Sequence, residues 1–266
     1  MSDEWGTDEL DLPAYLNRIG QPAGEPDGAT LARLHRAHVA AIGFENLDVV
    51  LGHGVAVDLA AVQDKLVERH RGGYCYEHGV LFAAVLTRLG FDVDRLLARI
   101  GHDPQRPRAR THMALRVTGS DGQWLADVGF GTGLLTPLPW TDDGREARQG
   151  GWTYRLVDDG GWQLQERTPE GWTPLYSMIL EPVHASDVVM ANHFTSTYPS
   201  SPFVGRIVVV HENEHHRTRL LGRELAITRP DGSTSRRDID DHELAVLLRE
   251  RFGIALTDGD LAALTT

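Results

Sequence analysis

The chain has 266 residues, of which 41% are hydrophobic and 24% are charged, as is typical of a folded globular protein that can bury a sizeable core. The formal net charge of −12 argues against a nucleic-acid or anionic-membrane partner, but it still allows a local basic pocket for an anionic cofactor. One cysteine excludes an intramolecular disulfide, and the acidic start of the chain and its short apolar runs argue against a signal peptide and a membrane span. Together these features predict a cytoplasmic protein.

The first ninety residues carry apolar side chains at helical spacing, so we expect a helical bundle there. Each predicted helix begins at a residue that can cap or open it, and the four starts are Asp11, Thr30, Asp58 and Cys75. Gly20 is predicted to end the first helix. The segment Gly43–Leu47 interrupts the helical pattern between the second helix and the third.

The single cysteine lies in the segment Arg71–Phe82, directly after two glycines. Glycine is used where the backbone turns tightly or runs close to another group, so we expect a turn before the helix that starts at Cys75 and stops at Gly90. Unpaired N–H groups at a helix start carry partial positive charge, which favours thiolate over thiol. Cys75 is therefore a candidate nucleophile, although a lone cysteine is also commonly a small buried hydrophobe until its partners are found.

Beyond residue 90 the apolar period changes to two, which is typical of strands. The spacing predicts six strands, at Val93–Ile100, Met113–Val117, Trp124–Val128, Trp152–Val157, Trp162–Glu166 and Trp172–Ile179. Their short separations favour a small antiparallel barrel or a curled sheet.

The C-terminal part mixes strand and helix patterns. Asn192–Pro202 is rich in Ser, Thr and Pro and is predicted to be a loop. Phe203–Val210 and Arg217–Thr228 are predicted to form a hairpin, followed by an amphipathic helix at Asp241–Phe252 and a final turn at Leu261–Leu264.

Two residues of the strand region are candidate partners for Cys75. His112 begins one predicted strand and Asp127 ends the next, so adjacent antiparallel pairing would bring the two side chains together. Asp127 would then hold the imidazole of His112 in one tautomer, and His112 would take the proton of Cys75. The alternative is that His112 caps a sheet edge and that Asp127 only starts a turn.

Five short motifs resemble those of the arylamine N-acetyltransferase family. They are Arg71–Cys75, Thr111-His112 before a strand, Leu125–Gly131, Phe44–Leu47 and Thr195–Phe203. Two positions depart from the family pattern: Gly43 stands where the family usually has proline, and Tyr198 stands where bacterial members often have histidine. The motifs follow the family's order, and the resemblance extends from about residue 10 to residue 225.

The resemblance implies an α+β fold in three parts. Residues 1–90 would form a helical bundle that carries the cysteine, residues 91–190 an antiparallel β-barrel that carries the histidine and the aspartate, and residues 191–266 an α/β lid. The core of this fold is similar to that of transglutaminase-like cysteine enzymes.

The resemblance also implies an activity, which is transfer of an acetyl group from acetyl-CoA to an aromatic amine, hydroxylamine or hydrazine. Transfer would follow a ping-pong mechanism through an acetyl-cysteine thioester and would need no metal. Cys75 would be the nucleophile, His112 the base and Asp127 the group that orients the base.

Four further residues are predicted to support this site. Tyr76 and Phe130 would face the acceptor, because aromatic rings stack well on an arylamine; for Tyr76, plain core packing is an equal alternative. Arg71 and Glu45 would form a buried ion pair that ties the first helices to the Cys75 turn, and an ordinary solvated pair is the alternative.

The cofactor contacts are predicted from small residues near the site. Gly129 and Gly131 would leave the backbone bare, so that the pantetheine arm of CoA can approach. Thr197, Ser200 and Ser201 would bond to polar groups of CoA, or they would only be turn residues.

One motif in the chain points to different chemistry. His211–His215 reads His-Glu-Asn-Glu-His, which matches the zinc-protease pattern, but that pattern needs a helix to bring both histidines to one face. Here it follows Val208-Val209-Val210, so we expect a hairpin loop and no zinc site. The other histidines, His35, His38 and His70 among them, are expected to be surface or satisfied core residues.

Three other functions fit a similar site. An amide synthase of the same fold would release a polyketide from a carrier protein. A transglutaminase-like cysteine hydrolase would cleave an ester or amide with water and without CoA. A binding module that has lost its activity is disfavoured by the intact set of Cys75, His112 and Asp127.

Overall fold

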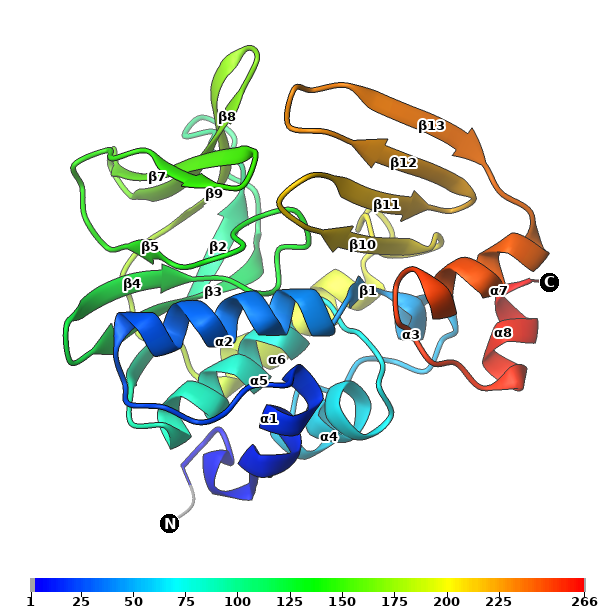
Figure 1. The fold of residues 1–266 in the computed structure, drawn as a ribbon, viewed down its shortest axis with the longest axis horizontal. Helices are drawn as coiled ribbons and strands as arrows, with labels where there is room; N and C mark the ends of the chain where they lie inside the picture. The colour runs from blue at the N-terminus through cyan, green and yellow to red at the C-terminus, as the bar shows by residue number, and fades with distance from the viewer. Residues whose placement is uncertain (1–2, 266) are drawn as a thin grey trace.

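The structure is a computed structural model that describes residues 3–265. Figure 1 shows the N-terminal helices along one side of the molecule, with a curled sheet and a second, smaller sheet side by side above them. Two short C-terminal helices pack at the outer end of the smaller sheet. This mixed arrangement of helix and antiparallel sheet confirms the predicted α+β fold.

The N-terminal helices begin close to where the sequence predicts. Their bounds are η1 (Thr7–Glu9), α1 (Leu12–Ile19), α2 (Gly28–Ala41), α3 (Leu47–Val50), α4 (Leu59–Gln63), η2 (Asp64–Glu68) and α5 (Cys75–Arg88). Asp11 and Asp58 cap α1 and α4 with their carboxylates, as expected. The cap of α2 was predicted three residues too late, at Thr30, because Asp27 is the capping residue and its carboxylate accepts the N–H of Thr30.

All six predicted strands lie in one eight-stranded antiparallel sheet with the order β5-β4-β3-β2-β9-β8-β7-β6. The bounds are β2 (Asp92–Ile100), β3 (Arg110–Gly119), β4 (Gly122–Ala126), β5 (Leu138–Pro139), β6 (Ala147–Gln149), β7 (Trp152–Asp158), β8 (Trp162–Thr168) and β9 (Gly171–Met178). β3 and β4 are antiparallel neighbours, with Leu115 opposite Ala126. This register brings His112, near the start of β3, beside Asp127, which directly follows β4.

The smaller sheet is formed mainly by C-terminal strands. Its order is β1-β10-β11-β12-β13, with β1 (Phe44–Glu45), β10 (Val208–Glu212), β11 (Arg217–Leu221), β12 (Glu224–Thr228) and β13 (Thr234–Asp238). The predicted strand Arg217–Thr228 is two strands, because Gly222 has a φ of 60° and turns the chain between them. α7 (Asp241–Glu250) and α8 (Asp258–Leu264) follow, the second of them longer than the predicted turn.

The prediction of a loop at Asn192–Pro202 was wrong for its first half, which belongs to helix α6 (Ala185–Thr197). Thr195, Ser196 and Thr197 each donate a hydroxyl hydrogen bond to the carbonyl oxygen four residues earlier, at 2.8, 2.9 and 2.6 Å. Such back-bonding satisfies hydroxyl side chains inside a helix, so a cluster of Ser and Thr does not by itself mark a loop.

The buried hydrophobic side chains of the described residues form three clusters. One surrounds α5, one fills the curled sheet, and one lies between the smaller sheet and α7. The division at residues 90 and 190 into three units stays a prediction, since residue 190 lies inside α6 and β1 pairs with β10 of the last unit. Within residues 3–265 no helix is long and apolar enough to cross a membrane.

Arg217 connects the two sheets. Its guanidinium bonds to Glu212 at 2.9 Å in the smaller sheet, and to Glu166 at 2.7 Å and Tyr154 at 2.7 Å in the curled sheet. It also lies 3.8 Å above the ring centre of Trp152. Burial raises the pKa of Glu212 to about 7, and the charge of Arg217 opposes that rise.

The turn before α5 packs backbone against backbone. Glu45 N–H donates to the carbonyl of Gly73 at 2.8 Å, and Gly73 N–H donates to that of Gly43 at 3.2 Å. A Cβ atom on Gly72 would lie 2.2 Å from the carbonyl oxygen of Gly43. The glycine at this position is therefore required by close approach of two chain segments, which is one of the two reasons predicted from the sequence.

We expect Gly72→Ala to lower the free energy of unfolding by roughly 1–3 kcal/mol, because the added methyl group must displace the backbone of Gly43. Urea unfolding followed by circular dichroism measures the loss. Gly259→Ala is the matched control: its Cβ would meet only the Thr257 hydroxyl at 3.9 Å, and it lies in α8, so stability should stay equal or rise. Equal stability of both variants would contradict the packing argument.

Candidate active site

Cys75 lies at the first position of α5 with 3% of its surface exposed. Its thiol donates to the carbonyl oxygen of Thr111 at 3.7 Å, and the N–H groups of Met113 and Tyr76 also point to the sulfur. The sulfur therefore lies against β3, between the backbone groups that flank His112.

His112 and Asp127 form a buried pair. His112 Nε2 lies 2.7 Å from Asp127 Oδ2, and the two residues are 2% and 3% exposed. Burial would raise the pKa of Asp127, but His112 and the N–H of Gly129, 3.0 Å from Oδ1, hold it below its usual value. The carboxylate is therefore charged and accepts from Nε2, so the neutral ring keeps Nδ1 free to act as a base.

The N–H of Tyr76 at the helix start lowers the pKa of Cys75, as expected, but burial acts more strongly in the opposite direction. Burial raises the pKa of the thiol well above its usual range, and the nearby charge of Asp127 raises it further. The N–H groups of Met113 and Tyr76 act in the opposite direction without offsetting these effects. Burial and the charge of Asp127 thus oppose the thiolate, so a base within the protein is needed to take the proton of Cys75.

A chain of buried histidines anchors the Cys75 turn. His78 Nε2 lies 3.1 Å from the carbonyl of Gly73 and 3.2 Å from that of Gly43, so this nitrogen carries the hydrogen. His78 Nδ1 then accepts from His38 Nε2 at 2.8 Å, and His38 Nδ1 accepts from the Tyr15 hydroxyl at 2.9 Å. Every nitrogen of this chain is used, which fixes both rings in one tautomer.

His35 anchors the other end of the site. Its Nε2 accepts the backbone N–H of Asp127 at 3.1 Å, so Nδ1 carries the hydrogen and donates to the Leu135 carbonyl at 3.2 Å. The prediction that His35 and His38 are satisfied core residues is confirmed, since both are fully buried and hydrogen-bonded. Their contacts with the segments around Cys75 and Asp127 were missed, because those contacts join residues far apart in the sequence.

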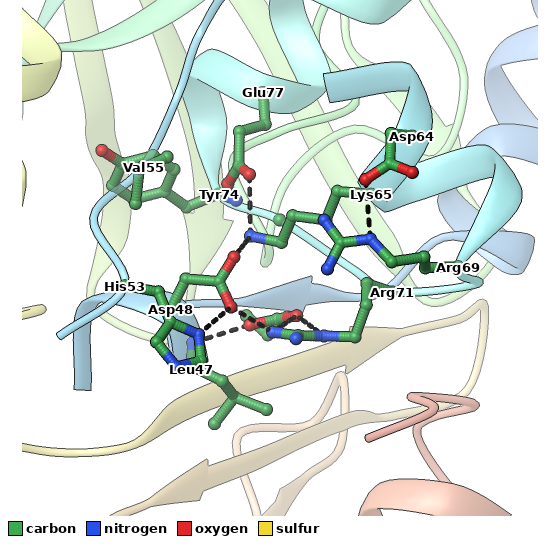
Figure 2. Close-up of polar contacts among 12 residues, drawn as sticks. Leu47, Asp48, His53, Val55, Asp64, Lys65, Arg69, Arg71, Tyr74 and Glu77 are labelled. Atoms are coloured by element: carbon green, nitrogen blue, oxygen red, sulfur yellow. Dashed lines mark hydrogen bonds and ion pairs between the residues drawn. The ribbon is translucent and has the colours of Figure 1, made fainter. Parts of the chain in front are cut away.

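Arg71 and Glu45 form the buried ion pair that the sequence predicts, with 2.7 Å between Arg71 Nη2 and Glu45 Oε1. Figure 2 shows that Arg71 belongs to a larger network with Asp48, Lys65 and Glu77. Asp48 accepts from Arg71 at 2.9 Å and from Lys65 at 2.8 Å, and Lys65 also reaches Glu77 at 2.7 Å.

Glu77 joins this network to the start of helix α5. Its second oxygen accepts the N–H of Tyr74 at 2.9 Å, which is the residue before Cys75. The carboxylate thus closes the helix start in the manner of a capping box, while Lys65 compensates its buried charge. The position of Glu77, three residues after the cap, was a signal for this role that our sequence analysis did not use.

The two aromatic residues predicted to face the acceptor, Phe130 and Tyr76, have different surroundings. The ring of Phe130 is 5.2 Å from that of His112 and 5.4 Å from that of Tyr176, and Phe130 lines a cavity of about 680 Å³. Tyr76, in contrast, has no exposed surface, packs edge-on against Tyr74 and places its hydroxyl 3.3 Å from that of Thr195. The assignment of Tyr76 to the acceptor pocket is corrected: it is a core residue, which was the alternative.

The small residues predicted to contact CoA have partners within the protein. A Cβ on Gly129 would lie 3.0 Å from the backbone of Cys75, and a Cβ on Gly131 would lie 3.1 Å from the ring of Phe44. The hydroxyls of Thr197 and Ser201 donate to the carbonyls of His193 and Thr195, and Ser200 is exposed. Contacts of these five residues with CoA stay a prediction.

The His-Glu-x-x-His motif lies where the sequence predicts, at the end of β10 and in the turn to β11 rather than on a helix. Glu212 of this motif is engaged with Arg217. Across residues 3–265 no group of three or more His, Cys, Asp or Glu side chains is arranged to hold a metal ion.

Comparison with known proteins gives the class of this fold and site. The sequence profile of the N-acetyltransferase family matches residues 27–261. The arylamine N-acetyltransferase of Mycolicibacterium smegmatis is 38% identical, over 95% of this chain and 94% of that protein. The chain therefore belongs to the arylamine N-acetyltransferase family.

Solved structures agree with this result. The arylamine N-acetyltransferase of Mycobacterium abscessus has a TM-score of 0.92 at 40% identity, covering 98% of this chain and 95% of that one. The Mycobacterium marinum enzyme, solved in complex with CoA, has a TM-score of 0.88 at 37% identity, covering 96% and 98%.

We expect the buried histidines to make stability depend on pH. Burial lowers the pKa of His35 and of His78 from 6.5 to about 4 in the folded protein. The unfolded chain therefore takes up protons first, so this part of the stability is complete above pH 6.5. It is lost as the pH falls toward 4, by about 1.4 kcal/mol per unit for each histidine.

Urea unfolding of the native protein and of His78→Gln at pH 7, 6 and 5 measures this effect. The difference in stability between the two proteins should shrink as the pH falls, because the variant lacks one of the groups that must stay neutral. A constant difference over this range would mean that His78 does not titrate as its burial requires.

Proposed function

We propose that the protein transfers an acetyl group from acetyl-CoA to an arylamine, an arylhydroxylamine or an arylhydrazine through an acetyl thioester on Cys75. The observation that carries this proposal is the buried contact of 2.7 Å between His112 and Asp127, together with the contact of Cys75 Sγ with the carbonyl of Thr111, the residue before His112, at 3.7 Å. Membership of the family, and the CoA complex of the M. marinum relative, support acetyl-CoA as the donor.

In the first half-reaction the thiol proton of Cys75 moves to Nδ1 of His112, the nitrogen that Asp127 leaves free. The sulfur attacks the carbonyl carbon of the thioester, the bond from that carbon to the sulfur of CoA breaks, and CoA leaves with the proton that His112 held. One thioester replaces another, so the step is nearly balanced in free energy.

In the second half-reaction the nitrogen of the acceptor attacks the acetyl carbon on Cys75. An aromatic amine is weakly basic, so near pH 7 it is neutral and has a free electron pair. His112 takes the proton that the nitrogen loses, the bond to Cys75 sulfur breaks, and the amide product leaves. Proton transfer from His112 to the sulfur restores the starting enzyme.

Both half-reactions pass through a tetrahedral oxyanion, which needs hydrogen-bond donors. We assign this role to the backbone N–H of Cys75 at the start of α5, since the first N–H groups of a helix have no partner within it, whereas Glu77 holds the N–H of Tyr74 and the N–H of Tyr76 points to the sulfur. The charge network behind Glu77 would keep this helix start rigid.

We expect a gain of one acetyl group in intact mass when the protein is mixed with acetyl-CoA and no acceptor. Cys75→Ala should show no gain while keeping the fold, as circular dichroism can check. Addition of an arylamine should return the mass to that of the free protein and release the amide. Release of acetate without an acceptor, and no stable gain, would instead favour a cysteine hydrolase; an acyl group taken only from a carrier protein would favour an amide synthase.

We expect Asp127→Asn to lower kcat by on the order of 10³-fold or more, because an amide cannot hold His112 in the required tautomer. Asp159→Asn, an exposed aspartate in the β7–β8 turn, is the control and should keep full rate. Steady-state release of CoA measures both. A loss of only a few-fold in Asp127→Asn would reduce Asp127 to a structural residue.

A further inference from the structure

The cavity beside Phe130 has a cationic wall built from three neighbouring strands. The antiparallel register places Arg99 of β2 opposite Arg110 of β3 on one side and opposite Ser177 of β9 on the other. All three residues line the cavity of about 680 Å³. Two guanidinium groups and a hydroxyl are thus adjacent on one surface.

Arginines that face each other across two strands repel, so this arrangement is unfavourable without an anion between them. Burial lowers the pKa of Arg110, and the neighbouring charge of Arg99 lowers it further. Arg110 has a partner in Glu181, whereas Arg99 donates to the backbone carbonyl of Arg108 and pairs with no carboxylate of residues 3–265.

The other charged groups of this wall do not balance Arg99. Arg108 lines the cavity as well and adds a third positive charge. Asp103 supplies one negative charge on the wall, but its Oδ1 accepts the N–H groups of Gln105 and Arg106 at 3.0 and 3.1 Å, and it forms no ion pair with any of the three arginines. In a chain of net charge −12, this cavity wall is therefore locally positive.

The same cavity has apolar lining residues, and one of them contacts His112. Ile100, Met178 and Phe130 are among them, and Phe130 meets the ring of His112 edge-on at 5.2 Å. An aromatic ring can stack on Phe130 while a group at its far end reaches the arginines. The aromatic ring and the arginines line the same cavity, so one ligand can contact both.

We propose that Arg99 and Arg110, together with Ser177, form an oxyanion subsite of the acyl-transfer site, which receives the carboxylate of an aromatic amine acceptor. This inference rests on the proposed function, because it names the acceptor class for that reaction. Planar carboxylates match the guanidinium fork and accept two hydrogen bonds from it. Phosphate groups of the donor have the same chemistry, so the experiment has to separate the two sources.

The two half-reactions allow that separation. In a ping-pong mechanism kcat/KM for the acceptor reports only the second half-reaction, and kcat/KM for the donor reports only the first. The acceptor pair is 4-aminobenzoate and the uncharged 4-methoxyaniline, and the donor pair is acetyl-CoA and acetyl-pantetheine, which lacks the phosphates. The kcat/KM of the native protein is divided by that of the variant for each substrate separately, so differences in intrinsic reactivity between the substrates cancel.

We expect Arg99→Gln to lower kcat/KM for 4-aminobenzoate by about tenfold or more, the usual weight of a charge-assisted hydrogen bond. The value for 4-methoxyaniline should change by less than about twofold. Arg99→Lys should recover part of the loss, because it restores the charge without the fork. Arg106→Gln is the matched control, since Arg106 is an exposed arginine between β2 and β3 that does not line the cavity, and it should leave all four values unchanged.

A selective loss with acetyl-CoA that is absent with acetyl-pantetheine would keep the oxyanion subsite but assign it to the donor phosphates, and so would overturn the acceptor assignment. Equal losses with all four substrates, or none, would overturn the subsite itself. The mass gain on Cys75 in the absence of an acceptor tests the proposed function separately. If Arg99→Gln still gains one acetyl group, the proposed acetyl transfer is retained even when the subsite proposal is overturned.

Discussion

The burial of a charged carboxylate at Asp127 is the constraint on which this site depends. A carboxylate that is 3% exposed has lost its water and must be paired by the protein. His112 and the N–H of Gly129 pair its two oxygens, and His35 fixes its backbone from helix α2. Each partner comes from a different segment, so the helices and the curled sheet must be assembled before the carboxylate is satisfied. The same charge raises the pKa of Cys75, so in the proposed reaction the sulfur depends on His112 to take its proton.

Much of this arrangement could be predicted from the sequence, because it rests on local patterns. The glycine turn and the helical spacing after Cys75 identify the nucleophile helix, and the period of two predicts all six strands of the curled sheet. Once those strands are taken as neighbours, the pairing of His112 with Asp127 follows from their positions at the strand ends. The capping aspartates are equally local signals and predicted two helix starts correctly.

The remainder could not be predicted, because it depends on contacts between distant segments or on competing local rules. The hydroxyls of Thr195 and Thr197 can stabilise a loop or bond back into a helix, and only the packing of α6 decides between them. The aromatic ring of Tyr76 suits a pocket or a core equally well, and its direction is set by α6. The cationic wall at Arg99 arises from strand register, to which the sequence around Arg99 gives no local clue.

Lys65, which joins Asp48 to Glu77 behind the nucleophile turn, is the only lysine in the chain. Its side chain is 5% exposed, and its pKa lies above the ordinary lysine value despite burial, because three carboxylates surround it. A protonated amine has no electron pair for attack, so this side chain cannot capture an activated acyl group. An acylated form of the enzyme would therefore meet no lysine nucleophile of its own, and lysine-directed labels should leave Lys65 unmodified until the protein unfolds.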